Sequence, residues 1–351
     1  MLSDPLASQT GPSGRMPRVC SGDTEAIAWP EDFPFPALPR VARAEDADLL
    51  LFPWYWQPFR TAINPSQLDP DRPDLAAALQ QRLDQLEAAS QRLAKPLLLF
   101  RYHDSSEPLP HAHGWVWRTS LLASQRGSHE QALPAFHADP QPEWQALGGC
   151  VDPLAWTAVP SVGFCGQALP LDPGLRKRLG EALRRRLGRP LAGIPGYRWR
   201  RDAMRSCRRH PAGLTCGFQL SDPLETTAAA EQRRRFLANL YGHHYVICAS
   251  GYGNYSYRFY EALAAGRIPV FIDSDCVLPF EELVPWRELV VWVEASEVHR
   301  TADRILAFHQ QFDAAALHDH QRKLRELWQS HCTPAGFQRT VSVQLTQQAP
   351  H

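Results

Sequence analysis

A glycine-containing loop followed directly by a helix holds the residue types that could bind a diphosphate. An apolar run predicts a strand over 244–250, and the spacing of apolar residues predicts a helix over 256–265. Between them stands the sequence Gly-Tyr-Gly-Asn. Glycine lets a ligand approach the backbone closely, and the first N–H groups of a helix are unpaired at the positive end of its dipole. The pattern predicts a pyrophosphate cradle that includes Gly253, Asn254 and Ser256.

Two charged residues of the same predicted helix strengthen this interpretation. Arg258 and Glu261 are three residues apart, so they lie on one face just past the loop. A guanidinium offers forked donors to a phosphate, and a carboxylate accepts from ribose hydroxyls. The alternative is an ion pair on a solvated face, but a cation placed before an anion opposes the favourable order. Tyr257 and the other bulky neighbours also leave little of this helix to be a solvated face.

The stretch SYRFYEALAAGRIPVFIDSDCVLPFEELVPW (256–286) closely resembles the signature of exostosin-like glycosyltransferases, glycosyltransferase family 47, which includes bacterial-type members. Weaker matches in the N-terminal half are ADLLLFPWYW, LLLFRYHD and WRTSL. The resemblance implies a GT-B fold, an inverting mechanism and a nucleotide-sugar donor, which we expect to be a UDP-sugar. It also implies that Glu261 contacts the donor ribose and Arg258 the diphosphate. The segment 163–166 with Arg176 matches the family's F-x-G…R segment, which makes Arg176 a second phosphate contact.

An Asp-x-Asp pair, Asp273 and Asp275, follows the predicted strand over 267–272. Two carboxylates at this spacing can coordinate Mg²⁺ or Mn²⁺, as they do in glycosyltransferases of the A type. The alternative is that both residues shape a turn. We favour the turn because the surrounding motif resembles the B-type family, and we therefore expect no metal cofactor.

Sugar transfer with inversion also needs a base that removes the proton of the acceptor hydroxyl. Arg-Tyr-His-Asp follows the predicted strand over 96–100, where the N-terminal half should face the donor domain. Asp104 or His103 is therefore the candidate base. In the alternative, Asp104 caps a turn and His103 makes a structural hydrogen bond, and the sequence leaves both interpretations open.

Alternating strands and helices must position these residues. The first half predicts strands over 46–56 and 96–100 around a helix over 73–95. The second half predicts strands over 161–165, 214–220, 244–250, 267–272 and 289–293, and helices over 174–187, 197–209, 227–241, 256–265, 299–312 and 314–330. Two such alternations predict an α/β fold with two Rossmann-like domains that face a cleft.

The domain boundaries follow from composition. We predict an irregular Pro-rich leader over 1–45, an acceptor-side domain with its linker over 46–158, a nucleotide-sugar-binding domain over 159–332 and a tail over 333–351. The loop-rich segment 123–158 is the candidate connection between the two domains.

The composition restricts the function classes further. The chain has 351 residues, 44% of them hydrophobic, which suffices for two cores and excludes a wholly disordered chain. Its 37 basic and 37 acidic residues balance, so we expect no nucleic-acid partner. No apolar run reaches the 18 residues of a membrane span. Eight scattered cysteines and no signal-peptide pattern predict a reducing, cytoplasmic location.

One segment departs from this neutrality. Between 174 and 210 stand thirteen Lys or Arg residues but only two acids. Such a run predicts a solvated face, and the alternative is peripheral docking on the anionic inner face of a membrane, where a lipid-linked acceptor would lie. The expected partners are therefore a nucleotide-sugar donor and a glycan or lipid-linked acceptor. The alternative function is a non-catalytic exostosin-like protein that binds the sugar nucleotide or serves as a scaffold.

Overall fold

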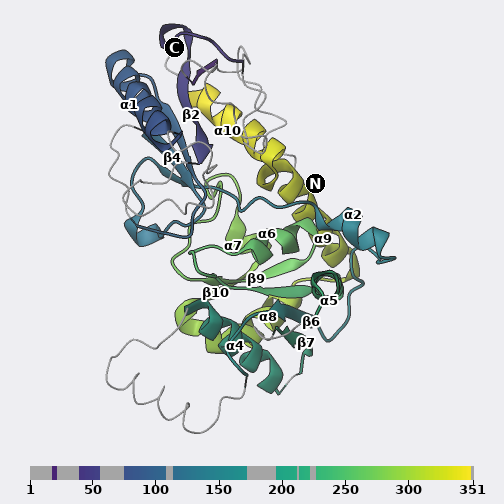
Figure 1. Cartoon of the computed structure of the whole chain (residues 1–351). Helices are drawn as coiled ribbons and strands as arrows, with labels where there is room; N and C mark the ends of the chain where they lie inside the picture. The colour runs from purple at the N-terminus through teal and green to yellow at the C-terminus, as the bar shows by residue number, and fades with distance from the viewer. Residues whose placement is uncertain are drawn as a thin grey trace, which may run out of the picture.

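The computed structural model describes residues 18–21, 39–55, 75–107, 114–171, 195–211, 213–221 and 227–348. These residues form two parallel five-stranded sheets, and helices cover both faces of each sheet (Figure 1). One hydrophobic core runs from Leu98 and Phe100 in the first sheet to Ile247 and Val270 in the second. The predicted α/β class with two parallel-sheet units is confirmed.

The N-terminal sheet contains β1 (Val19–Cys20), β2 (Leu49–Tyr55), β3 (Leu97–Arg101), β4 (Gly114–Arg118) and β5 (Glu130–Ala132), paired in this order and all parallel. Because side chains alternate along a strand, Leu97 and Leu99 point to one face and Leu98 and Phe100 to the other. Helix α1 (Leu75–Leu93) packs on the first face, where Leu83 joins a cluster with both of those leucines.

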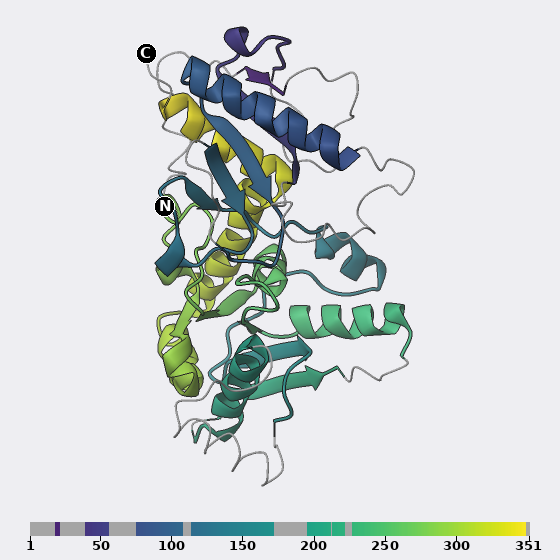
Figure 2. The same ribbon diagram turned by 60° about the vertical axis from the view of Figure 1, so that its left-hand side comes forward.

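The second face of this sheet is covered by α10 (Pro334–Gln348), the C-terminal helix. Phe337 of α10 lies against Phe100 and Trp117, with ring centroids 6.3 and 6.4 Å apart. When the neighbouring strands of a parallel sheet follow one another in sequence order, their right-handed crossovers all lie on the same face. The opposite face must therefore be covered by a helix from another part of the chain. Figure 2 shows α1 in front of the strands and α10 behind them. The expected tail over 333–351 is therefore corrected: residues 334–348 form a helix of the N-terminal unit.

Two further expectations are corrected in this half. Val19–Cys20, inside the expected leader, is a buried strand that pairs with β2. The segment 123–158 contains β5 and α2 (Pro140–Ala146) as well as loops, and β4 precedes it. Strands of two and three residues are too short to show a period-2 pattern in the sequence.

The C-terminal sheet has the order β10-β9-β8-β6-β7 and is parallel throughout. Its strands are β6 (Ser161–Gly166), β7 (Thr215–Leu220), β8 (Tyr245–Cys248), β9 (Ile268–Asp273) and β10 (Val291–Glu294). One face of this sheet is covered by α4 (Pro195–Arg209) and α8 (Thr301–His309). The other face is covered by α5 (Ala229–Tyr241) and α6 (Tyr257–Ala264). Helix α9 (Ala314–Leu327) packs against α6. Shorter helical segments are Ala44–Asp46, Ala123–Gln125, α7 (Trp286–Leu289), Ala295–Arg300 and Trp328–Cys332.

The strand order fixes where a ligand can enter this unit. From β6 the chain passes to β7, which lies on one side of β6, and then to β8, which lies on the other side of β6. Helices α4 and α6 therefore lie on opposite faces, and a crevice opens beyond the carboxyl ends of β6 and β8. The predicted helix over 174–187 lies outside the described residues.

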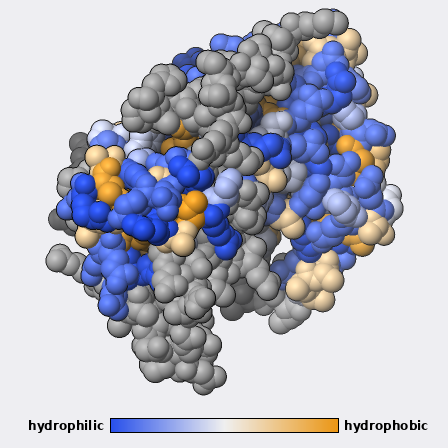
Figure 3. Space-filling view, turned by 90° about the horizontal axis from the view of Figure 1, so that it is seen from above, coloured by the Kyte–Doolittle hydropathy of each residue, from blue (hydrophilic) through white to orange (hydrophobic). Residues whose placement is uncertain are grey.

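None of the helices in the described part of the chain is both long and apolar enough to cross a membrane. The face shown in Figure 3 is mostly hydrophilic where residues are coloured, and its hydrophobic patches are small and separate.

We expect Phe337→Ala to lower the free energy of unfolding by about 3–5 kcal/mol, because it removes a fully buried ring between the sheet and α10. Urea denaturation followed by circular dichroism measures this. Arg339→Ala, an exposed position of the same helix, is the control and should change the value by less than about 0.5 kcal/mol. Equal effects of the two variants would show that α10 is not part of this core.

Candidate functional site

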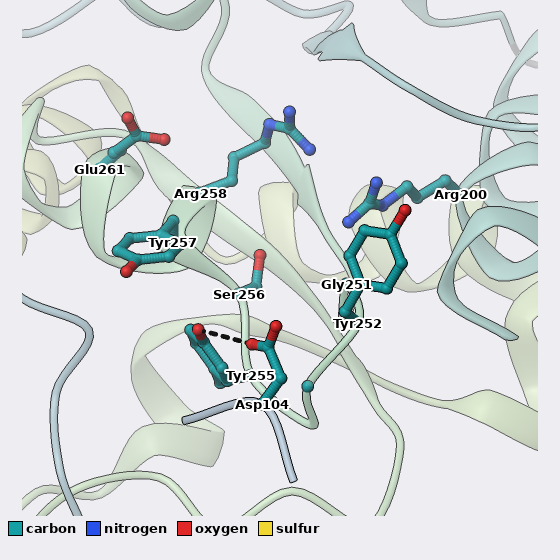
Figure 4. A pocket seen from close by; sticks show the side chains of 10 residues that line it. Asp104, Arg200, Gly251, Tyr252, Tyr255, Ser256, Tyr257, Arg258 and Glu261 are labelled. Carbon is teal, nitrogen blue, oxygen red and sulfur yellow. Dashed lines mark hydrogen bonds between the residues drawn. The ribbon is translucent and has the colours of Figure 1, made fainter. Parts of the chain in front are cut away.

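A cavity of about 280 Å³ opens beyond the carboxyl end of β8, between the two units. Asp104 reaches it from the N-terminal unit, and every other residue that lines it belongs to the C-terminal unit (Figure 4). The lining residues are Asp104, Arg200, Gly251, Tyr252, Gly253, Tyr255, Ser256, Tyr257, Arg258 and Glu261. The structure therefore brings together most of the residues that the sequence singles out.

The loop between β8 and α6 closes on itself before the helix begins. The N–H of Gly251 donates to the carbonyl of Tyr255 at 3.2 Å. Ser256 is the N-cap of α6 in an extended conformation, and within the described residues its hydroxyl makes no capping hydrogen bond. The first N–H groups of a helix lack partners in the helix itself. The cavity therefore borders a helix N-terminus whose capping hydroxyl is uncommitted.

Arg258, on the first turn of α6, is held by the carboxyl end of β6. Its Nη2 donates to the carbonyl of Cys165 at 2.6 Å, and its guanidinium lies 4.4 Å from the ring centre of Phe164. Gly166 has a φ of +142°, and a Cβ there would lie 2.6 Å from Arg258 Nη2. Only glycine satisfies both conditions. The F-x-G part of the predicted segment thus positions Arg258, while Arg176 lies outside the described residues.

Arg200 of α4 is a second cation at this cavity, and sequence reasoning missed it. Its guanidinium donates to the carbonyls of Gln167 at 2.9 Å and Ser250 at 3.0 Å. In the sequence, Arg200 is distinguished only as one of the thirteen basic residues between 174 and 210. A signal was available, because Arg200 is three and four residues before the buried Ala203 and Met204 and so belongs to the inward face of the helix.

The two guanidiniums make one part of the cavity wall positive, while Asp104 and Glu261 line other parts of the same cavity. Burial, and then the charge of Arg258, lower the pKa of Arg200 to about 10, so Arg200 is still protonated at pH 7. Within the described residues, neither Arg200 nor Arg258 has a carboxylate at ion-pair distance, and the buried Nε of each has no hydrogen-bond partner. Two half-buried cations that are not ion-paired with a carboxylate form a site suited to an anion with two negative charges.

Glu261 lies one turn further along α6, on the side of Arg258 away from Arg200 (Figure 4). Its side chain is 17% exposed, and Oε1 is 3.5 Å from Nη1 of Arg233 on α5. A carboxylate beyond the cation pair is placed to accept from hydroxyls of a ligand whose anionic part binds the arginines.

The structure brings Asp104 to the cavity, while His103 is not among the residues that line it. Asp104 Oδ1 accepts a hydrogen bond of 2.9 Å from the hydroxyl of Tyr255. His103 Nδ1 accepts from the N–H of Ser105 at 2.9 Å, which is a local structural hydrogen bond. Tyr255, which no sequence signal identified, thus orients one oxygen of Asp104 across the junction of the units.

The backbone around Asp104 is fixed by the end of β4. Arg118 is 1% exposed and pairs with Glu130 at 2.7 Å. It donates to the carbonyls of Ser105 at 2.8 Å and Glu107 at 3.0 Å. The sheet therefore holds the segment that carries Asp104, although that segment is itself a loop.

Asn254 has a structural environment. Its N–H donates to Ser120 Oγ at 2.8 Å, its Nδ2 donates to the carbonyls of Leu121 and Asp275, and its Oδ1 accepts from Ser274 Oγ at 2.6 Å. Asn254 does not line the cavity. Its predicted role in donor binding stays a prediction, and the structure shows it joining the two units.

The Asp273 carboxylate makes a turn contact, whereas the Asp275 carboxylate contacts the N-terminal unit. Asp273 Oδ1 accepts from the N–H of Cys276 at 3.1 Å, and burial raises the pKa of Asp273. Asp275 has a φ of +67° and accepts from the N–H and the hydroxyl of Ser124. Among the described residues, no group of three or more His, Cys, Asp or Glu side chains could hold a metal ion.

Comparison with known proteins identifies relatives of part of the chain. Residues 198–307, from α4 to α8, match the Exostosin GT47 domain, which confirms the predicted resemblance for this part. A probable glucuronosyltransferase of Oryza sativa subsp. japonica is 43% identical over 54 residues, which are 15% of this chain and 13% of the rice protein. A probable beta-1,4-xylosyltransferase of Arabidopsis thaliana is 41% identical over 54 residues, with the same shares of 15% and 13%.

Two further similarities are weaker than these. Exostosin-1 of Drosophila melanogaster is 39% identical over 64 residues, which are 16% of this chain and 8% of the fly protein. A solved structure of a Staphylococcus aureus TarM mutant with Fondaparinux, alpha-GlcNAc-glycerol and UDP has a TM-score of 0.34 and 10% identity, over 70% of this chain and 50% of that one. No conclusion about fold or function follows from a TM-score this low. The chain spans 13% or less of the length of the three relatives compared by sequence.

We expect Gly253→Ala to destabilise the protein by about 1–3 kcal/mol, because a Cβ at 253 would lie 2.6 Å from Cε1 of Tyr255 and 2.9 Å from both Cα and Oδ1 of Asp104. Gly251→Ala is the matched control: its Cβ would meet only Arg200 Nη2, at 3.7 Å. That variant should change stability by less than about 1 kcal/mol. Urea denaturation of both variants checks the contact between the units, and equal stabilities would contradict it.

Proposed function

We propose that this protein is an inverting glycosyltransferase that transfers a sugar from a UDP-sugar to a glycan or glycoconjugate. The observation that carries the proposal is the pair of half-buried cations, Arg200 and Arg258, without an ion-paired carboxylate in the described residues. The pair lies beside the N-terminus of α6 at the crevice between β6 and β8. The match of residues 198–307 to the Exostosin GT47 domain and the transferase names of the relatives support sugar transfer from a nucleotide sugar.

The donor binds through groups of the C-terminal unit. Arg200, Arg258 and the helix N-terminus at Ser256 hold the diphosphate, and Glu261 accepts from the ribose hydroxyls. When the glycosidic bond to the diphosphate breaks, negative charge grows on the leaving oxygen. Two fixed guanidiniums and a helix dipole stabilise that charge without rearrangement. In this proposal the two arginines stabilise the leaving group, and the expectation that no metal cofactor takes part stays a prediction.

The N-terminal unit supplies the base. Asp104 Oδ1 is held by Tyr255, so the second carboxylate oxygen accepts the proton of the acceptor hydroxyl. The acceptor oxygen then bonds to the anomeric carbon from the face opposite the diphosphate, and the configuration inverts. A second candidate function, a binding or scaffold protein that keeps the donor site without transfer, differs only in this step. Cytoplasmic location, membrane contact through 174–210, the absence of a nucleic-acid partner and the bacterial-type assignment stay predictions of the sequence.

Nucleotide binding tests the donor site. We expect UDP to raise the melting temperature, since a ligand at 100 times its dissociation constant stabilises by about 2.7 kcal/mol. Arg200→Met should weaken UDP binding by at least tenfold, because a hydrogen bond to a charged group contributes about 1.5–3 kcal/mol. Arg208→Met, at an exposed position of the same helix, is the control and should bind UDP normally. If neither UDP nor GDP shifts the melting temperature, the proposed donor site is wrong.

Asp104→Asn separates the two candidate functions. A transferase with Asp104 as its base should keep its UDP affinity within about twofold and lose about 10²–10⁴-fold in transfer rate. His103→Gln, the matched variant of the neighbouring residue, should retain transfer. Radiolabelled sugar incorporation into an acceptor measures the rate. Full turnover by Asp104→Asn would exclude Asp104 as the base, and absence of turnover by the unmodified protein with every donor that binds would favour the scaffold.

A further inference from the structure

Glu261 has a charged neighbour that neither the sequence motif nor the proposed function explains. Arg233 of α5 places Nη1 3.5 Å from Glu261 Oε1. The same guanidinium uses its other edge for Glu143 of α2: Nε is 2.9 Å and Nη2 is 2.8 Å from Oε2. Arg233 therefore bridges a carboxylate of the donor cavity and a carboxylate of the segment between the two sheets.

Of the two carboxylates that contact Arg233, Glu143 holds its guanidinium more firmly. Two hydrogen bonds to one carboxylate fix the plane of a guanidinium, while the single longer contact to Glu261 leaves that carboxylate free to accept from a ligand. The Glu261 side chain is 17% exposed, compared with 44% for Glu143. A cation beside the less exposed carboxylate keeps that carboxylate turned in one direction.

Helix α2 is also connected to α6, the helix that carries Glu261, through hydrogen bonds of Arg325. Asp139, the N-cap of α2, accepts from Arg325 of α9 at 2.8 Å through Oδ1. The same Nη1 of Arg325 donates to the carbonyl of Ala264, the last residue of α6, at 2.5 Å. Helix α2 thus meets α6 twice, through Arg325 at the end of the helix and through Arg233 at Glu261.

An ordinary surface ion pair is the alternative explanation, and α5 offers one for comparison. Arg234, the next residue, pairs with Glu231 three positions earlier at 2.8 Å, and its side chain is 59% exposed. Such an exposed pair contributes little to stability, and neither of its residues lines the cavity. Arg233 differs because its partners come from two other helices, one of which lines the cavity.

We propose that Arg233 is a positioning residue for the donor ribose. It holds the Glu261 carboxylate in the orientation that accepts from the ribose hydroxyls, and Glu143 of α2 holds Arg233. Donor affinity therefore depends on a helix of the segment between the two sheets. This inference rests on the proposed function, since it takes Glu261 as the ribose contact.

Calorimetric titration of the full chain with UDP and with 2′,3′-dideoxy-UDP tests the inference. The unmodified protein should bind UDP more tightly than the dideoxy compound, which offers Glu261 no hydroxyl. Arg233→Ala should weaken UDP binding by about fivefold or more and leave the affinity for dideoxy-UDP unchanged within twofold. Glu143→Gln should weaken UDP binding in the same selective way but less. Arg234→Ala, the matched control, should bind both nucleotides like the unmodified protein.

Three results would overturn the inference, and they are distinguishable. If Arg233→Ala binds UDP normally, Arg233 has no positioning role. If that variant loses the same factor with both nucleotides, its role is to support the fold around α6 and not to orient Glu261. If the unmodified protein binds neither nucleotide, the proposed function itself fails. An Arg233→Ala change made in a Glu261→Ala background should weaken UDP binding no further, because the two residues act as one unit.

Discussion

Two like charges on neighbouring, half-buried side chains are the constraint on which this structure depends. Removing a guanidinium from water is costly, and placing a second one nearby adds repulsion. The chain reduces the cost with backbone carbonyls: Cys165 accepts from Arg258, and Gln167 and Ser250 accept from Arg200. Carbonyls at the ends of β6 and β8 can converge in this way only because the strand order places those strands side by side. Carbonyl dipoles do not neutralise the two guanidiniums, so the part of the cavity wall that they form stays positive.

The N-terminal unit presents one carboxylate to the cavity that these two cations line. Asp104 stands on a loop, but Arg118 and Glu130 fix the loop from within the sheet, and Tyr255 fixes the carboxylate from the other unit. The sheet in turn depends on α10, the last helix of the described chain, to cover its second face. The two units therefore share a core and a site, and each completes the other.

The long, periodic elements of the fold were predictable from the sequence, and the short ones were not. The leucine stripe of α1 and the continuous apolar runs of β3 and β8 gave elements within a few residues of those observed. Strands β1 and β5 have two and three residues, and their strand conformation comes from pairing with neighbours rather than from a pattern of their own. Helix α10 has an apolar face without a local partner, and only the sheet order shows what that face covers.

The sequence by itself determined the α/β class, the loop and helix from Gly251 to Glu261, and the chemistry of Arg258 and Glu261, because these depend on local spacing and side-chain type. Only the tertiary structure decided that Asp104 rather than His103 reaches the cavity and that Asn254 joins the two units. It also decided that Arg200, fifty-eight residues before Arg258, completes the cation pair. The direction of a side chain relative to a distant cavity depends on how helices and sheets pack, and neighbours in sequence carry little of that information.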